Sequence, residues 1–192
     1  MNGLLFIRHA ETDMARRFCG HSDPPINARG KQQIQALVES IERKSIGAVY
    51  CSDLRRSVIT AEVLAAASSL SVVAKRSLRE IHFGDWEGLS WAEIERRDAT
   101  YARDWVNAFP KLAAPGGERF TNFEARVMAE VDSLVRLAKD QRIAVVAHGG
   151  VMRVALQKLL ACSEKEAWSR TLPYCCSFAY EGEMAHLREV RK

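Results

Sequence analysis

The sequence predicts an α/β domain, a three-layer α/β/α sandwich in which helices cover both faces of a mostly parallel sheet. Short apolar runs at 4–7, 48–51 and 143–147 have the composition of strands that are buried on both faces. Amphipathic helical patterns follow these runs, and strands that alternate with helices pair in parallel through right-handed crossovers. The length of 192 residues and the hydrophobic content of 47% suit one core, so we expect a single domain over 1–192.

Capping residues indicate where the helices begin. Asn27 is expected to cap the first helix, whose apolar face consists of Ile34, Leu37, Val38 and Ile41. Ser52 or Asp53 is expected to cap the second, whose buried stripe consists of Leu54, Val58, Ala61 and Ala65. Residues 121–124 read Thr-Asn-Phe-Glu, the pattern of a capping box that opens a third helix. A last helix is predicted over 151–160.

Three further segments complete the predicted fold. Residues 71–78 have the pattern of a strand, and 177–190 have the pattern of a two-stranded edge with a turn near 181–182. Residues 81–120 show poor strand signals, so we expect a helical and loop insertion over the sheet edge, where insertions shape substrate pockets. This insertion is rich in residues that break regular structure or pack as aromatics: Trp86, Trp91, Trp105, Pro110, Pro115 and the glycines at 116–117.

Composition narrows the classes of function and location. Lys and Arg number 28 against 24 Asp and Glu, and this net charge of +4 is scattered, which favours anionic small molecules over nucleic acid. The five cysteines have no Cys-x-x-Cys spacing, so we expect free thiols, no metal site and no cofactor. The sequence shows neither a signal peptide nor a membrane span, which predicts a cytoplasmic protein without a membrane partner. It leaves the oligomeric state open.

Two histidines at the ends of apolar runs are the main functional signal. His9 follows the run 4–7, and His148 follows the run 143–147. The carboxyl edge of an open α/β sheet is where such folds bind ligands. Arg8 beside His9 suits a phosphate, and histidine can act as nucleophile, acid or base near neutral pH. We therefore predict a phosphoryl-transfer site.

Other residues supply what phosphomonoester chemistry needs. The phosphate dianion needs cations and fixed donors, and the leaving oxygen needs a proton. Arg56 can add a cation, and Gly149 and Gly150 begin a helix whose backbone N–H groups can bind the phosphate. Glu80 follows a predicted strand and is the candidate proton donor. Four positive or imidazole groups make a metal ion unnecessary here.

Four blocks, in order, resemble the histidine phosphatase superfamily, the phosphoglycerate mutase-like group. They are Arg-His-Ala-Glu-Thr at 8–12, Ser-Asp-Leu-Arg-Arg-Ser at 52–57, Leu-Arg-Glu at 78–80 with Phe-Gly-Asp-Trp-Glu-Gly at 83–88, and His-Gly-Gly at 148–150. The resemblance covers residues 4 to about 160. It implies a phosphoglycerate mutase-like fold and a phosphohistidine intermediate.

Carried over residue by residue, the resemblance implies that His9 is phosphorylated and that Glu80 protonates the leaving oxygen and later activates water. It implies that the transferring group is bound by Arg8, Arg56 and His148. Of the adjacent arginines at 55 and 56, helical geometry turns only one toward the pocket. The chain departs from the family at Ala10, where glycine is usual, and at Ala15, where many members carry asparagine. Arg16 or Arg17 is a possible replacement for that missing donor.

Within the family, the chain is most similar to the α-ribazole phosphatase branch, which acts in cobalamin nucleotide-loop assembly. This resemblance implies the substrate α-ribazole 5′-phosphate. Its carrying segments are 19–23, 80–87, 105–110 and 116–120, and the expected substrate-binding residues are Cys19, Gly20, Trp86, Trp105, Glu118 and Gly149. Two alternatives are a phosphoglycerate mutase, which is usually longer, and a broad-specificity or fructose 2,6-bisphosphate phosphatase. A non-catalytic phosphate-binding protein is disfavoured because His9 and Glu80 are both retained.

Overall fold

The computed structural model describes residues 2–41 and 46–182, and it contains one five-stranded sheet. The strands are β1 (Gly3–Arg8), β2 (Ile46–Ser52), β3 (Val72–Lys75), β4 (Arg142–Ala147) and β5 (Ser177–Tyr180). Their order is β3-β2-β4-β1-β5, with β5 antiparallel to its neighbour and the other strands parallel. The predicted mostly parallel α/β sheet is confirmed.

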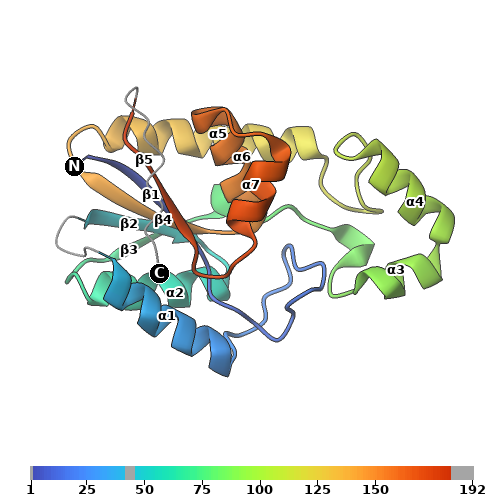
Figure 1. Cartoon of the computed structure of the whole chain (residues 1–192), viewed down its shortest axis with the longest axis horizontal. Helices are drawn as coiled ribbons and strands as arrows, with labels where there is room; N and C mark the ends of the chain where they lie inside the picture. Colours follow the sequence, from blue (N-terminus) through green and yellow to red (C-terminus); the bar gives the residue numbers. More distant parts are fainter. Residues whose placement is uncertain (1, 42–45, 183–192) are drawn as a thin grey trace.

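Helices cover both faces of this sheet, as a three-layer sandwich requires (Figure 1). On one face lie α1 (Ala28–Ser40) and α2 (Arg55–Ala66), and on the other lie α5 (Phe120–Leu137), α6 (Gly149–Leu160) and α7 (Glu164–Thr171). The Asn27 side chain caps α1 by accepting a hydrogen bond from the Gly30 N–H, as predicted. No described helix has the length and apolar content that a membrane crossing needs.

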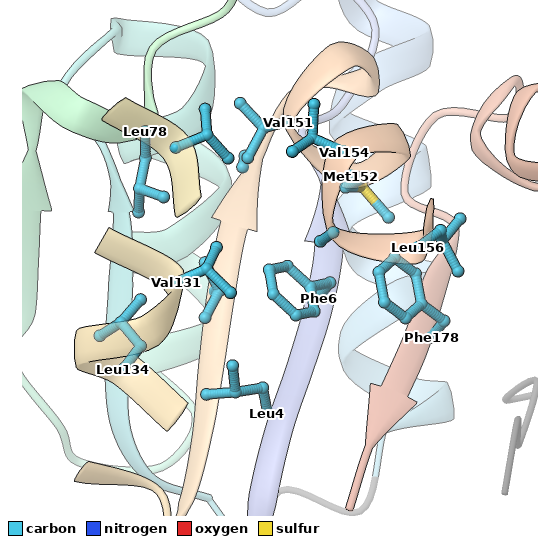
Figure 2. Packing of buried hydrophobic residues seen from close by; sticks show 14 of the residues in the cluster. Leu4, Phe6, Leu78, Val131, Leu134, Val151, Met152, Val154, Leu156 and Phe178 are labelled. Carbon is cyan, nitrogen blue, oxygen red and sulfur yellow. The ribbon is translucent and has the colours of Figure 1, made fainter. Parts of the chain in front are cut away.

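The alternation of side chains along β1 explains how the two faces are filled. Leu4 and Phe6 point to one face, where they pack with residues of α5 and α6, and the Phe6 ring stacks on Phe178 of β5 at 4.9 Å between centroids (Figure 2). Leu5 and Ile7 point to the other face and pack with residues of α1 and α2. All four are buried, so a strand of period 2 contributes to two cores at once.

The predicted insertion is helical and has a small core of its own. It carries α3 (Trp91–Arg97) and α4 (Ala99–Ala108), which lie beyond the sheet rather than over either of its faces (Figure 1). Trp86 is only 6% exposed and forms edge-to-face contacts with Trp91 and Trp105. These aromatic contacts hold the insertion together independently of the sheet cores.

Several local expectations were wrong, and each has a physical reason. The helix α2 has no side-chain cap, because the Asp53 carboxylate instead binds the Arg79 guanidinium at 2.6 and 2.8 Å. The helix α5 begins at Phe120 without the capping box expected at 121–124. A capping box does occur at Ser90, where the side chain of Glu93 completes it at the start of α3.

Two strand boundaries and one helix also differ from expectation. The strand predicted over 71–78 ends at Lys75, and Arg76–Leu78 form a 3-10 turn. The helix α7 was not predicted, although Ser163 caps it. The edge strand β5 is present at the predicted start of the tail, and the second strand predicted there lies outside the described residues.

Candidate active site

The pairing of β1 with β4 brings the two strand-end histidines together. In this parallel pair Arg8 is in register with Ala147, so His9 and His148 leave the sheet at the same edge. Their rings lie 5.0 Å apart between centroids, and both side chains are buried. The backbone N–H of His9 also donates to the Ala147 carbonyl at 2.9 Å. Strand register alone therefore places two imidazoles next to each other, as the sequence predicted.

The hydrogen bonds of His9 define which ring nitrogen carries the proton and which carries the lone pair. Its Nδ1 lies 2.7 Å from the carbonyl oxygen of Ala10, and a carbonyl oxygen can only accept, so Nδ1 carries the proton. Its Nε2 accepts a hydrogen bond from Arg56 Nε at 3.3 Å. Burial, together with the positive charges of Arg56 and Arg8, lowers the pKa of His9 well below 6.5. The ring is therefore neutral, with the Nε2 lone pair facing Arg56.

Arg56 is fully buried and is held at the first turn of α2. Its Nη1 donates to the Ser22 carbonyl at 2.6 Å, and its Nη2 donates to the carbonyls of Gly20 and Cys19 at 2.7 and 3.3 Å. These carbonyls fix the plane of the guanidinium and leave Nε directed at His9. The neighbouring Arg55 is exposed, which confirms that only one of the two arginines faces the pocket.

Arg8 approaches the site from the end of β1. Its Nη1 donates to the carbonyls of Thr171 and Leu172 at the end of α7, and its guanidinium carbon lies 4.2 Å above the Tyr174 ring. Its Nε is buried without a hydrogen-bond partner among the described residues. The Tyr174 ring lies 5.7 Å from that of His9, so this tyrosine lines the site although no sequence pattern pointed to it.

His148 is the least satisfied polar group of the site. It is 1% exposed, and neither ring nitrogen has a hydrogen-bond partner within the described part of the chain. Burial, followed by the positive charge of Arg56, lowers its pKa well below 6.5. A buried imidazole without partners carries a free-energy cost that a hydrogen-bonding ligand would remove. A phosphate dianion would also raise its pKa and favour the protonated form.

Glu80 is held against the first turn of α6. Its Oε2 accepts a hydrogen bond from the Gly150 N–H at 2.9 Å, and its Oε1 accepts from the Ile81 N–H at 3.0 Å. A Cβ at position 150 would lie 2.1 Å from Glu80 Oε1, so this close approach requires glycine. The second glycine of the His-Gly-Gly block is thus needed to admit the carboxylate.

The N-terminus of α6 is a further feature that favours anion binding. His148 is the N-cap residue, and its side chain makes no capping hydrogen bond. Gly149 is the first residue of the helix, and its missing side chain leaves room for the guanidinium groups of Arg8 and Arg153 nearby. Backbone N–H groups at a helix start bind phosphate readily. The expected contribution of Gly149 therefore stays a prediction that this geometry favours.

The loop at 19–22 is fixed by a carboxylate for which the sequence reasoning assigned no role. Glu87 accepts hydrogen bonds from the backbone N–H groups of Gly20, His21, Ser22 and Phe83, and from the Ser22 hydroxyl. Burial opposes ionisation, yet these donors hold the pKa of Glu87 below its ordinary value. The position of Glu87 inside the Phe-Gly-Asp-Trp-Glu-Gly block was the available signal.

The expected substrate-binding residues Cys19, Trp86, Trp105 and Glu118 each have a different local environment. Cys19 contacts Arg56 through its carbonyl, and burial raises the pKa of its thiol to about 11, which fits an unreactive thiol. Trp86 lies inside the aromatic cluster, and this favours packing. Trp105 is partly buried beside Phe109. Glu118 forms a bidentate ion pair with Arg126. Substrate contact by these residues stays a prediction.

The two departures from the family pattern are Ala10 and Ala15. Ala10 has no positive φ, so glycine is not required there, and its N–H donates to Thr60 Oγ1 at 3.1 Å. Arg17 donates to Glu93 and to the Gly88 carbonyl, both at 2.8 Å, and these contacts tie it to the insertion. It therefore does not replace the asparagine absent at Ala15.

A separate cavity of about 880 Å³ lies beside β5 and α1. Its lining includes Glu11, Gln33 and Tyr174, but none of His9, Arg56, Glu80 or His148. We place the chemistry at the strand ends, because phosphoryl transfer needs converging donors and a nucleophile. Over residues 2–41 and 46–182, no three His, Cys, Asp or Glu side chains are grouped to hold a metal ion.

Comparison with known proteins defines the class of protein. The sequence profile of the histidine phosphatase superfamily (branch 1) matches residues 4–190. The chain is 31% identical over 167 residues to the adenosylcobalamin/α-ribazole phosphatase of Escherichia coli K12, covering 86% of this chain and 82% of that protein. It is 30% identical over 168 residues to phosphoserine phosphatase 1 of Hydrogenobacter thermophilus, covering 86% and 80%.

A solved structure agrees with the sequence relatives. The crystal structure of the α-ribazole phosphatase from Shigella flexneri superposes with a TM-score of 0.86 at 29% identity, covering 97% of this chain and 94% of that one. The chain therefore belongs to the histidine phosphatase superfamily, branch 1. It is an enzyme of the phosphatase and mutase class, with the fold and phosphoric monoester hydrolase class that the sequence predicted.

Proposed function

We propose that the chain hydrolyses phosphomonoesters through a phosphohistidine at His9. The observation that carries this proposal is the pair of hydrogen bonds that fixes the His9 tautomer. The Ala10 carbonyl keeps the proton on Nδ1, and the Nε2 lone pair faces Arg56. A neutral imidazole with a fixed tautomer is a competent nucleophile at neutral pH. The donor of Arg56 that now contacts Nε2 would pass to a phosphate oxygen when substrate binds.

In the first step, His9 Nε2 attacks phosphorus while the bond from phosphorus to the leaving oxygen breaks. The protonated carboxyl of Glu80 gives its proton to that oxygen, so the alcohol leaves neutral. Arg8, Arg56 and protonated His148 stabilise the charge on the phosphoryl oxygens, together with N–H groups at the start of α6. A covalent intermediate divides one difficult displacement into two easier ones.

In the second step, the Glu80 carboxylate takes a proton from water as the water oxygen attacks phosphorus. The bond from phosphorus to His9 Nε2 breaks, and inorganic phosphate leaves. The carboxyl group of Glu80 thus regains the proton that it gave up in the first step, and His9 is again neutral. No metal ion or cofactor enters either step, since the arginines and histidines supply the positive charge.

A partitioning experiment tests the common intermediate. Glycerol added as a second acceptor would compete with water for the phosphohistidine. Because every substrate yields the same phosphoenzyme, the ratio of glycerol phosphate to inorganic phosphate should be constant across phosphomonoesters with different leaving groups. A ratio that varies with the leaving group would show direct attack by water and would contradict the proposal.

For the physiological substrate, we propose α-ribazole 5′-phosphate, in cobalamin nucleotide-loop assembly. Two relatives support this, because the proteins from E. coli and S. flexneri carry the name α-ribazole phosphatase. The aromatic insertion next to the phosphate site also suits a flat base better than a small, doubly charged acid. A cytoplasmic location is supported by five free cysteine thiols, which persist in reducing compartments.

Competition between two substrates tests this assignment. With α-ribazole 5′-phosphate and 3-phosphoglycerate present together, we expect the higher kcat/KM for the ribazole compound. Parity, or preference for 3-phosphoglycerate, would remove the cobalamin assignment and leave the phosphatase proposal intact. A phosphoglycerate mutase would instead convert 3-phosphoglycerate without releasing stoichiometric phosphate, and a fructose 2,6-bisphosphate phosphatase would release phosphate from that sugar.

A further inference from the structure

The segment that carries Glu80 has no regular secondary structure to hold it. It follows the 3-10 turn Arg76–Leu78 and precedes the turn Gly84–Trp86, and residues 79–83 belong to neither. No ladder of strand hydrogen bonds fixes its backbone. A proton donor must nevertheless be placed accurately, since small displacements of a catalytic group are costly. Side chains outside the segment must therefore set its position, and both His21 and Arg126 contact the Glu80 carbonyl, each at 3.0 Å.

Arg126 of α5 contacts the backbone on the Glu80 segment at three carbonyls. Its Nη1 donates to the carbonyls of Ser77 and Arg79, both at 2.8 Å, and its Nη2 donates to the carbonyl of Glu80 at 3.0 Å. The same side chain also pairs with Glu118, through Nε and Nη2 at 2.8 Å each. One guanidinium therefore binds three backbone carbonyls within residues 77–80 and one carboxylate.

Glu118 in turn fixes Arg126 and joins the two ends of the insertion. The backbone N–H of Glu118 donates to the His82 carbonyl at 2.8 Å, and the N–H of His82 lies 3.4 Å from Glu118 Oε2. Burial opposes its ionisation, but hydrogen bonds and charge from Arg126 hold the pKa of Glu118 below its ordinary value. Glu118 therefore stays ionised near neutral pH.

The other side of Arg126 leads to the Glu80 carboxylate itself. Its guanidinium carbon lies 4.9 Å from the centre of the Phe123 ring. A Cβ built on Gly150 would lie 3.2 Å from Phe123 Cζ, so this ring abuts the glycine whose N–H binds Glu80 Oε2. Arg126 thus contacts both the Glu80 backbone and Phe123, the ring next to the glycine that binds the Glu80 carboxylate.

We propose that the Arg126–Glu118 pair is the positioning device for the proton donor Glu80, a role that rests on the proposed function above. Neither residue needs to touch the substrate. Arg126 holds the carbonyl side of the Glu80 segment, and Glu118 keeps the guanidinium in the required plane through a bidentate contact. The pair acts on the reaction only through Glu80.

The test compares two substrates that differ in their need for a proton. An alkyl phosphate needs protonation of the leaving oxygen, whereas p-nitrophenyl phosphate needs little. We expect Arg126→Met to lower kcat for the alkyl phosphate by about 10- to 100-fold and kcat for p-nitrophenyl phosphate by less than about 3-fold. Glu118→Gln, which keeps the shape of the side chain, should show the same selectivity at a smaller amplitude.

A double variant separates positioning from general support. Because Arg126 is proposed to act through Glu80, adding Arg126→Met to Glu80→Gln should cause no further loss on the alkyl phosphate. Glu124→Gln is the matched control: Glu124 also lies on α5 and forms an ion pair, with Lys158 at 3.0 Å, that does not include Arg126 or Glu118. This control should leave both substrates unchanged.

Three results would overturn the proposal. They are equal losses on both substrates, additive losses in the double variant, or unchanged kinetics for both Arg126→Met and Glu118→Gln. If Arg126→Met does not fold, Glu118→Gln and its combination with Glu80→Gln give the same comparison. Failure of the underlying function is distinguishable, because Glu80→Gln alone would then show no selectivity for the alkyl phosphate.

Discussion

The strand-end site and the aromatic cluster of the insertion are held in place by different kinds of interaction. At the ends of β1 and β4, two neutral histidines and a buried arginine are fixed by the strand register and by backbone carbonyls. In the aromatic cluster, Trp86 and Trp105 of the insertion and Phe18 of the loop after β1 contact one another edge to face, with ring centroids 5.2 to 5.9 Å apart. The polar groups at the strand ends determine the reaction, whereas the aromatic cluster determines the shape of the insertion.

Substitutions in the two regions should therefore have different effects on substrate use. His9 and His148 are placed by the register of β1 and β4, so a substitution of either should affect all substrates alike. The aromatic cluster is bounded by its own side chains, so changes there should alter which leaving group fits. Two contacts link the regions: Glu87 of the insertion binds the loop at 20–22, and the Arg126–Glu118 pair binds the Glu80 carbonyl.

The largest effect is expected at the nucleophile. His9→Asn should lower kcat by roughly 10⁴-fold or more for every phosphomonoester, because no covalent route remains. Steady-state kinetics on an alkyl and an aryl phosphate would measure it. Equal activity of the variant on either substrate would place the chemistry elsewhere in the molecule.

A loss that depends on the leaving group is expected for Glu80. Glu80→Gln should slow alkyl phosphates by about 10²- to 10⁴-fold, and p-nitrophenyl phosphate far less. The comparison of kcat for the two substrates measures proton donation directly. A uniform loss on both substrates would instead assign Glu80 a binding role and would contradict its role as proton donor.

The insertion should affect choice of substrate rather than chemistry. Trp105→Ala should narrow the preference for α-ribazole 5′-phosphate over 3-phosphoglycerate by roughly 10- to 100-fold, since an aromatic contact with a base is worth about 1–3 kcal/mol. The rate with p-nitrophenyl phosphate should change little. If the preference is unaltered, Trp105 serves only the packing of the insertion.

The buried histidines predict a pH dependence of stability. Both His9 and His148 have folded-state pKa values well below 6.5, so the unfolded chain takes up protons first as the pH falls. The free energy of unfolding should therefore decrease below about pH 6.5, by up to about 1.4 kcal/mol per pH unit for each histidine. Urea unfolding of wild type and His148→Asn should show a shallower slope for the variant; parallel curves would be inconsistent with a neutral buried His148.

The smallest effect is expected from removal of metal ions. Excess EDTA should leave turnover unchanged, because the arginines and histidines of the site supply the charge. Assays with and without the chelator, followed by addition of Mg²⁺ or Zn²⁺, would measure this. Loss on chelation with recovery on metal addition would require a different account of the strand-end site.

What the sequence could predict follows from the range of the interactions involved. His9 and His148 were predictable because each directly ends an apolar run, and the sheet edge is a consequence of strand direction. The role of Arg126 was not, because it binds carbonyls of residues 46 to 49 positions away, and a carbonyl leaves no mark in the sequence. The capping error at Asp53 has the same cause, since Arg79 lies 26 residues away.

The insertion shows a second kind of limit. Trp86 and Trp105 were predicted to line a substrate pocket, but aromatic side chains pack against one another as readily as they bind a ligand. Only the structure shows that Trp86 lies inside the cluster, whereas Trp105 lies nearer its boundary. Composition thus located the region but not the orientation of its side chains.

The central claim is that His9 carries the phosphoryl group during turnover. Rapid-quench labelling with a ³²P-phosphomonoester tests it directly in the wild type, in His9→Asn and in His148→Asn. We expect acid-labile, base-stable label on the wild type, none on His9→Asn, and label at His9, formed more slowly, on His148→Asn. Equal labelling of wild type and His9→Asn, or label mapped to another residue, would contradict the account.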